Sequence, residues 1–193
     1  MPLATSDSQH KILQAAKALA PRLGYAAVTM VDIAQEAGVG RATLYRHYTT
    51  KEHLYTDVIR LWAEEFAEQL KRRSLRGKTV GERVSSMLRA VIKEGADNLE
   101  LLTAQIACSI ADAPDLRANY IKVEESIGAL LAIALGTAVS QRQALAASVL
   151  SHVLMSSNII LVAGHTTPKA IAEEMIAAAA LLLADVWELP VGK

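Results

Sequence analysis

A short segment between residues 29 and 54 constrains the fold and the function of this chain more than any other part. Its sequence is TMVDIAQEAGVGRATLYRHYTTKEHL. Thr29 can cap the free amides of a helix, and Asp32 adds negative charge where the helix dipole favours it. Gly38 provides the backbone freedom that a sharp turn after this helix needs. The segment therefore predicts two short helices around a tight turn, followed by the start of a third helix.

The second of these helices, expected over residues 41–47, presents a polar and basic face. Leu44 and Tyr48 are expected to point inward, which leaves most of the other side chains wholly or partly exposed. Such a face on so short a helix is typical of the helix that enters the major groove in a helix-turn-helix motif. We therefore expect contacts with double-stranded DNA from Thr29, Arg41, Ala42, Thr43, Tyr45, Arg46, His47 and Lys51.

The chemistry of these side chains suggests individual roles. Arg41, near the helix N-terminus, is long enough for two hydrogen bonds to a guanine and is expected to set base specificity. Thr43 could bond a phosphate or touch a thymine methyl group, and His47 and Lys51 would extend the backbone contacts. The alternative for Arg46 is that its charge is simply solvated.

At GVGRATLYRHYTTKEHL the chain resembles the TetR family of bacterial transcription regulators. The resemblance covers residues 10–55 and rests on the glycine turn, the small-Thr-Leu-Tyr core and the Lys-Glu opening of the next helix. It implies an all-α fold of nine helices, with an N-terminal three-helix DNA-binding domain and a C-terminal ligand-binding and dimerisation domain. It also implies a ligand-responsive regulator, with repression as the favoured mode. Val31 and Arg46 depart from the family pattern, so less base readout is expected from the first helix of the motif.

Composition sets wider limits on the chain. With 193 residues, 52% of them hydrophobic, it can bury a sizeable core. The net charge is zero, but residues 1–51 hold six basic and three acidic residues, a balance that suits phosphate binding. Uninterrupted apolar runs are too short to span a membrane and are expected to be buried helices. A polar N-terminus and a single cysteine, Cys108, favour a cytoplasmic location and no internal disulfide.

Helical periodicity and helix-breaking residues predict helices along the whole chain. The helix at 51–72 carries one continuous apolar stripe and would join a DNA-binding domain, residues 1–52, to a ligand-binding and dimerisation domain, residues 53–193. A movement of that helix would couple ligand binding to DNA binding. The predicted helices are 7–23, 30–37, 41–47, 51–72, 80–97, 99–111, 114–135, 139–164 and 168–187.

The last two predicted helices are strongly apolar and rich in small residues. We expect 139–164 and 168–187 to form a homodimer as a four-helix bundle, on a palindromic operator with half-sites roughly 34 to 36 Å apart. A pocket for a small lipophilic effector is expected among helices 51–135 and 139–164. Its candidate ligand-binding residues are Trp62, Phe66, Leu88, Gln105, Cys108, Tyr120 and Asn158, with Met87, Val91, Glu124 and Ser157 as further lining.

Other classes of function have less support. The sequence has no Gly-rich phosphate loop, no Gly-x-Ser-x-Gly elbow and no closely spaced His or Cys set, so we expect no enzyme, no metal site and no cofactor. Gln105 and Asn158 could bond within the core or across the dimer instead of to a ligand, and Cys108 is expected to be inert core. A helical adaptor that had lost DNA binding would be expected to lack Arg41, Arg46 and Lys51.

Overall fold

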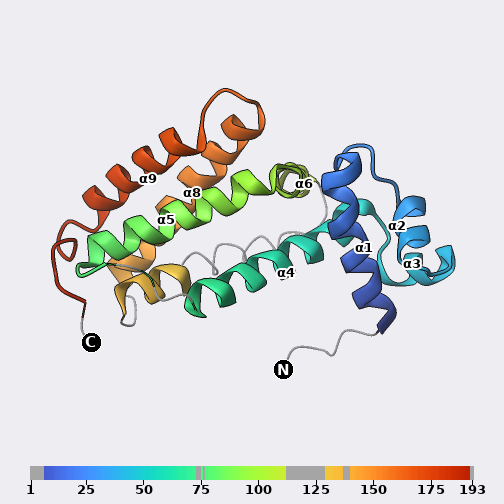
Figure 1. Ribbon diagram of the computed structural model, residues 1–193, viewed down its shortest axis with the longest axis horizontal. Helices are drawn as coiled ribbons and strands as arrows, with labels where there is room; N and C mark the ends of the chain where they lie inside the picture. Colours follow the sequence, from blue (N-terminus) through green and yellow to red (C-terminus); the bar gives the residue numbers. More distant parts are fainter. Residues whose placement is uncertain (1–6, 73–74, 76, 112–128, 137–139, 192–193) are drawn as a thin grey trace. The chain divides into compact units, whose positions relative to one another are not determined.

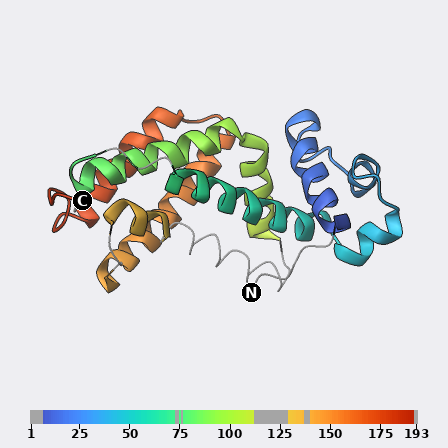
Figure 2. The same ribbon diagram turned by 60° about the horizontal axis from the view of Figure 1, so that its bottom comes forward.

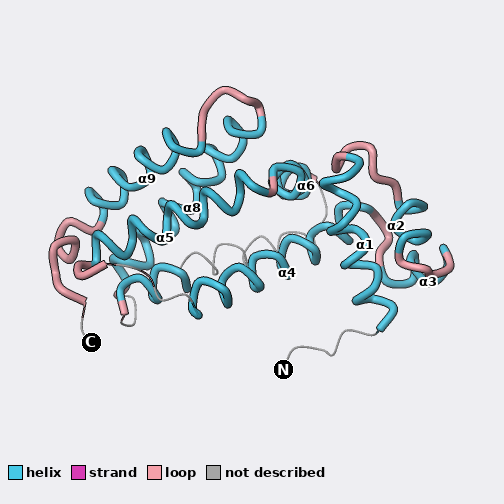
Figure 3. Tube along the Cα trace, viewed as in Figure 1, coloured by secondary structure: helices cyan, strands magenta, loops and turns pink. Residues whose placement is uncertain are grey.

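Helices dominate the structure of the chain. Figure 1 shows the computed structural model, which describes residues 7–72, 75, 77–111, 129–136 and 140–191. Within these residues the one pairing of strand type is an isolated bridge between Thr79 and Pro190. Figure 3, coloured by secondary structure, shows helices joined by loops. The all-α prediction is confirmed.

Most helix boundaries agree with the sequence signals to within two residues. The helix predicted over 114–135 is described only in its last part, where residues 129–135 are helical, and the rest of it lies outside the described residues. The labelled helices are α1 (Asp7–Leu23), α2 (Met30–Glu36), α3 (Arg41–His47), α4 (Lys51–Arg72), α5 (Val80–Asp97), α6 (Leu99–Ile110), α8 (Gln141–Val162) and α9 (Pro168–Leu182).

The prediction of a final helix over 168–187 is wrong at its C-terminal end. α9 ends earlier, and the chain turns back towards the start of α5. There the carbonyls of Trp187 and Leu189 accept hydrogen bonds from the amides of Gly81 and Val80, at 2.8 and 2.9 Å. First-turn amides have no partner within their own helix, so this tail caps α5. A Cβ atom on Gly81 would lie 2.5 Å from the Trp187 indole, so the close approach requires glycine.

The described helices fall into two compact units. The first contains α1, α2, α3, α4 as far as Trp62, and α6; the second contains α4 from Ala63, α5, residues 129–135, α8 and α9. α4 therefore passes from one unit into the other. These are units of packing, and the functional division into residues 1–52 and 53–193 stays a prediction.

In the first unit, α1 is the central helix, in contact with α2, α3 and α6 (Figure 1). Its Ile12, Ala16 and Ala20 are fully buried. The small alanine side chains let neighbouring helices come close, and the Tyr55 hydroxyl of α4 donates to the Ala16 carbonyl at 2.9 Å. The helix-turn-helix segment thus rests on a rigid base.

In the second unit, α9 lies against both α5 and α8, as the two views in Figures 1 and 2 show. Val84, Leu88 and Ile92 of α5 recur at intervals of one helical turn and are buried. Met175 of α9 and Leu150 of α8 are also buried. These side chains form the core of the unit.

α8 is long and apolar enough, by length and composition only, to cross a membrane. It has 22 residues and a mean hydropathy of 1.8 over the relevant window. The uninterrupted apolar runs within α8 are short, but its interspersed polar residues lower the mean hydropathy of the whole helix only slightly. One such helix is weak evidence for a membrane span, since core helices of soluble proteins have the same composition. Buried residues at Ala147, Leu150 and Leu154 follow the spacing of a packed helix.

Candidate nucleic-acid interface and ligand cavity

α2 begins with a complete capping box. The Thr29 hydroxyl oxygen accepts a hydrogen bond from the Asp32 amide at 3.2 Å, and the Asp32 carboxylate accepts from the Thr29 amide at 2.9 Å. The Thr29 hydroxyl also donates to this carboxylate at 2.6 Å, and these bonds lower the pKa of Asp32. The predicted cap is confirmed, with aspartate in the place usually taken by glutamate or glutamine. The contact between Thr29 and DNA stays a prediction.

The turn between α2 and α3 has the geometry of a Schellman motif. Gly38 has a φ of 65°, in the left-handed region that favours glycine. Its amide donates to the Gln35 carbonyl at 3.1 Å, and the Val39 amide donates to the Ala34 carbonyl at 3.0 Å. These bonds satisfy the last carbonyls of α2 and fix the angle at which α3 leaves the turn.

α3 directs its apolar side inward and its polar side outward, as predicted. Leu44 and Tyr48 are 0% and 1% exposed. Outside this pair, the side chains of the helix are available to a macromolecule that approaches the outer face. They are Arg41, Ala42, Tyr45 and Arg46, which are exposed, and Thr43 and His47, which are half-buried.

A hydrogen-bond network around Tyr48 fixes the end of α3. The Tyr48 hydroxyl accepts from Gln9 of α1 at 3.0 Å and donates to Asp57 of α4 at 3.0 Å. Burial raises the pKa of Tyr48, so the phenol keeps its proton at neutral pH. The His47 ring lies 3.3 Å from the Ser8 hydroxyl of α1. Two helices, α1 and α4, therefore hold the C-terminal end of the polar face of α3 in place.

The ammonium group of Lys51 binds the backbone of the loop between α1 and α2. Its ammonium group donates to the carbonyls of Tyr25, Ala26 and Val28, at 2.9, 3.3 and 3.2 Å. It also lies 4.4 Å from the centre of the Tyr25 ring, a cation–π distance. An ammonium group has three protons, and each has a backbone acceptor here. Lys51 thus holds the loop that leads into α2, and its contact with a DNA phosphate stays a prediction.

Tyr25 and Glu100 are important residues of this loop that the sequence analysis missed. The Tyr25 amide donates to the Glu100 carboxylate of α6 at 2.7 Å. The Tyr25 ring packs edge-to-face on Tyr55 of α4, with ring centres 4.9 Å apart. Glu100 is an acidic residue at the start of an otherwise uncharged helix, which was the available signal. α4 and α6 together determine where the loop enters the helix-turn-helix.

Cys108 belongs to the same cluster of the first unit. Its thiol donates to the Glu52 carbonyl of α4 at 3.5 Å. Burial raises the pKa of Cys108 to about 11, so the thiol is protonated at neutral pH. This environment agrees with the expectation of an inert core cysteine.

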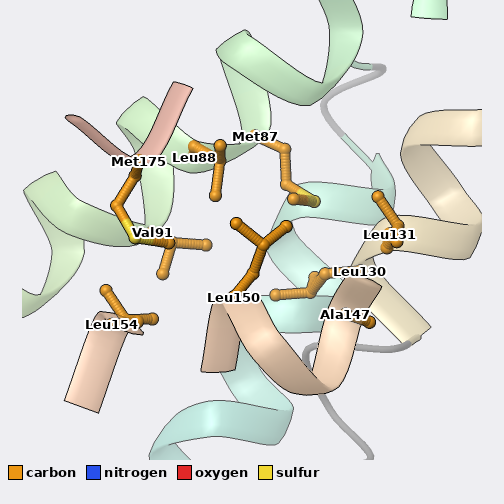
Figure 4. A pocket seen from close by; sticks show the side chains of 9 residues that line it. All are labelled: Met87, Leu88, Val91, Leu130, Leu131, Ala147, Leu150, Leu154 and Met175. Atoms are coloured by element: carbon orange, nitrogen blue, oxygen red, sulfur yellow. The ribbon is translucent and has the colours of Figure 1, made fainter. Parts of the chain in front are cut away.

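A small apolar cavity lies in the second unit. It has room for about one water molecule, and its walls come from α5, residues 129–135, α8 and α9 (Figure 4). Figure 4 shows these side chains converging on the space, with the sulfur-containing side chains of α5 and α9 among them. The lining residues are Met87, Leu88, Val91, Leu130, Leu131, Ala147, Leu150, Leu154 and Met175.

The structure does not bring the predicted ligand-binding residues together around this cavity. Leu88 lines it, as do Met87 and Val91, which were expected as further lining. The other candidates are dispersed, and their role in binding stays a prediction. They are Trp62, Gln105 and Cys108 in the first unit, Phe66 and Asn158 in the second unit away from the lining, and Tyr120, which with Glu124 lies outside the described residues.

α8 carries a row of exposed apolar side chains. Leu145, Val149, Val153 and Ile160 are 67%, 39%, 37% and 45% exposed and follow one another at spacings of four, four and seven residues. These spacings place them on one side of the helix. On α9, Leu181 is also exposed. Exposed apolar rows of this kind are typical of surfaces that bind another protein chain.

No group of three or more His, Cys, Asp or Glu side chains suited to a metal ion occurs among the described residues. Several acidic side chains form ion pairs at the surface, such as Asp7 with Lys11 and Glu36 with Arg22.

Sequence comparison places the N-terminal part of the chain in a known group. Residues 12–58 match the model of the bacterial regulatory proteins of the tetR family. The HTH-type transcriptional repressor KstR of Mycolicibacterium smegmatis is 33% identical over 85 residues, 44% of this chain and 42% of that protein. The regulator QacR of Staphylococcus aureus is 33% identical over 73 residues, 38% of this chain and 39% of that protein. The chain thus matches about two fifths of the length of these relatives.

Other comparisons cover nearly the whole chain. KstR of Mycobacterium tuberculosis is 24% identical over 183 residues, 94% of this chain and 83% of that protein. The crystal structure of a TetR transcriptional regulator from Rhodococcus sp. RHA1 has a TM-score of 0.82 at 22% identity, with 93% and 97% of the two chains covered. Thermus thermophilus FadR in complex with lauroyl-CoA has a TM-score of 0.73 at 23% identity, with 91% and 93% covered. The predicted TetR-like fold is confirmed.

Proposed function

Because the chain belongs to the TetR family of bacterial regulatory proteins, we propose that it is a transcriptional repressor that binds a palindromic operator as a homodimer and releases it on binding a small lipophilic effector. The observation that carries the proposal is the exposed basic face of α3 on a helix fixed at both ends. A face that is exposed and yet rigid can match the major groove without a large loss of conformational entropy on binding.

Arg41 is the residue we assign to base recognition. It is exposed at the N-terminal end of α3, so its guanidinium is free to approach the O6 and N7 atoms of a guanine. Thr43, Tyr45 and His47 are assigned to the flanking phosphates and sugars. Arg46 is exposed, and its charge favours DNA whether it contacts a base or a phosphate.

A gel-shift titration of Arg41→Ala tests the assignment. Loss of a bidentate contact is expected to weaken operator binding by roughly 1 to 3 kcal/mol and to relax selectivity at one base position. Arg89→Ala is the matched control, because Arg89 is exposed on α5 in the second unit and its loss changes the net charge equally. Equal operator affinity for Arg41→Ala and the control would refute the assignment.

The exposed apolar row on α8 supports the homodimer. Two copies related by a two-fold axis could bury Leu145 and Val149 of α8 together with Leu181 of α9 in a four-helix bundle. Two reading helices would then contact two half-sites, which doubles the number of phosphate contacts and requires a palindrome. This interface is the one predicted from helices 139–164 and 168–187.

The apolar cavity supports a lipophilic effector. Its lining consists of aliphatic and thioether side chains, which favour a hydrocarbon over a polar ligand. The structural neighbour FadR was crystallised with lauroyl-CoA, an acyl compound. The cavity has room for only about one water molecule, so a ligand would select a more open state. α4 begins in the first unit and ends in the second, and it would transmit this change to the helix-turn-helix. The effector would then lower the affinity of the protein for the operator, and the operator would lower its affinity for the effector.

A cytoplasmic location follows from this function, because the operator is chromosomal DNA. An enzyme is the competing class. The relatives that match the chain are regulators, and the buried, protonated Cys108 offers no nucleophile. We propose neither a catalytic role nor a cofactor.

A further inference from the structure

Arg83 is a positively charged residue of α5 that contacts residues 129–135. Both stretches contribute lining residues to the apolar cavity. Arg83 precedes the lining residue Met87 by about one turn of α5. Its guanidinium donates through Nη2 to the Ile133 carbonyl at 3.0 Å. Ile133 follows the lining residue Leu131 by two positions within the helical residues 129–135. The guanidinium therefore joins α5 to residues 129–135, and these two stretches supply five of the lining residues of the cavity.

One donor atom of this guanidinium has no hydrogen-bond partner in the part of the chain that the structure describes. The Nε atom of Arg83 is buried and has no hydrogen-bond partner. Arg83 takes part in none of the ion pairs of the described residues. Arg83 as a residue is half-buried, but a buried donor atom without an acceptor is destabilising. An anion that accepts from Nε would remove this cost.

A purely structural role for Arg83 explains only part of its hydrogen-bonding geometry. Residues 129–135 end at Gly136, and a cation near a helix C-terminus is stabilised by the last carbonyls. The bond from Nη2 to the Ile133 carbonyl fits that role. It leaves Nε without a partner, and a lysine would serve a single carbonyl equally well. The planar fork of arginine is suited to a carboxylate, which can accept from Nε and an Nη atom together.

We propose that the second unit binds a carboxylate-bearing amphiphile, with the carboxylate on Arg83 and the hydrocarbon chain in the apolar cavity. The proposal rests on the effector part of the proposed function and narrows its ligand class to free carboxylic acids with an alkyl chain. Met87 and Met175 line the cavity from α5 and α9. Because methionine side chains are unbranched and flexible, they can move aside to admit the chain. An acyl thioester would lack the charge at the end of its chain.

Isothermal titration calorimetry with decanoate and decanol tests the proposal on the unaltered full chain. The two probes share the hydrocarbon chain and differ in the charged head. A charge-assisted hydrogen-bond pair predicts that decanoate binds about tenfold to a hundredfold more tightly than decanol. Equal affinities would overturn the proposal, as would a preference for decanol.

Two variants assign the preference to Arg83. Arg83→Gln is expected to bind decanoate and decanol equally, whereas the exposed control Arg89→Gln on the same helix keeps the preference of the unaltered protein. Arg83→Lys retains the charge and is expected to restore part of the preference. A decanoate preference that survives Arg83→Gln would overturn the proposal. The proposal would also be overturned if decanoyl-CoA bound more tightly than decanoate both to the unaltered protein and to Arg83→Gln.

The failure of this proposal can be told apart from that of the proposed function. Operator binding and its dependence on Arg41 are measured without any ligand. If decanol and decanoate both release the operator at equal concentrations, the lipophilic effector stands and the role of Arg83 is refuted. If neither probe binds while the operator is bound, both the carboxylate proposal and the lipophilic effector are refuted, and the DNA-binding assignment stands.

Discussion

α2 and α3 are short helices whose cap and connecting turn are formed by near neighbours in the sequence, whereas the core of α5, α8 and α9 is formed by residues far apart in the sequence. The Thr29–Asp32 cap and the Gly38 turn act over three to five residues. The cavity instead gathers residues from Met87 to Met175. The first arrangement fixes the polar face of α3 without a ligand, and the proposed function requires the second to open by small shifts of long helices. On that proposal, one chain combines a constant DNA-binding face with an adaptable ligand site.

The largest expected difference between the two regions comes from removing one buried leucine in each. Leu44→Ala and Leu150→Ala should each lower the free energy of unfolding by about 2 to 5 kcal/mol, because each leaves a void in a packed core. Leu44 supports the DNA-facing helix, so Leu44→Ala should also abolish operator binding in a gel shift. Leu150→Ala should retain operator binding and enlarge the apolar cavity.

Chemical denaturation gives the two stabilities, and gel shifts below the denaturation midpoint give the operator affinities. Retention of operator binding by Leu44→Ala would show that the position of α3 does not depend on its core residue. Loss of operator binding by folded Leu150→Ala would show that the two regions are not separable.

Lys51→Met tests whether the ammonium group holds the loop or the DNA. Loss of its bonds to three carbonyls should lower the free energy of unfolding by about 1 to 3 kcal/mol. If the ammonium group holds only the loop, the salt dependence of operator binding should be unchanged, because its three protons are already donated to backbone carbonyls. Lys11→Met is the control, since Lys11 is exposed in the same unit and pairs only with Asp7 at the surface. A salt slope reduced by about one, with unchanged stability, would instead assign Lys51 to a phosphate.

Thr29→Ala should have the smallest effect, because it removes one local cap. The expected loss is about 1 kcal/mol in the free energy of unfolding, and Thr29→Ser should restore it, since serine provides the same hydroxyl acceptor. Thermal and urea denaturation followed by circular dichroism would measure both variants. An unchanged stability of Thr29→Ala would mean that contacts with α1, rather than the local cap, determine where α2 begins.

The sequence predicted features that depend on near neighbours better than features that depend on distant residues. The cap at Thr29, the turn at Gly38 and the inward Leu44 and Tyr48 were all predicted, because each depends on residues within a few positions. The exposed face of α3 then followed from helical geometry. The individual DNA contacts assigned to that face depend on a partner and stay predictions.

Contacts with distant backbone atoms could not be predicted in the same way. Lys51 donates to carbonyls, which every residue possesses and which therefore leave no sequence signature. The C-terminal tail leaves α9 because Trp187 and Leu189 meet the start of α5, about a hundred residues earlier in the chain. Helical periodicity describes one helix at a time, so it cannot show that the C-terminal tail contacts the start of α5. The cavity lining was missed for the same reason, apart from Met87, Leu88 and Val91 on a single helix.

The most direct test of the central claim is selection of binding sites from random DNA by the purified protein, followed by hydroxyl-radical footprinting on the enriched sequence. A rigid α3 on each of two protomers predicts a palindrome whose half-sites are protected in adjacent turns of the major groove, with centres roughly 34 to 36 Å apart. Each half-site should contain one position whose selectivity is lost with Arg41→Ala. Enrichment of no sequence, or of a single asymmetric site with one protected groove, would contradict the account.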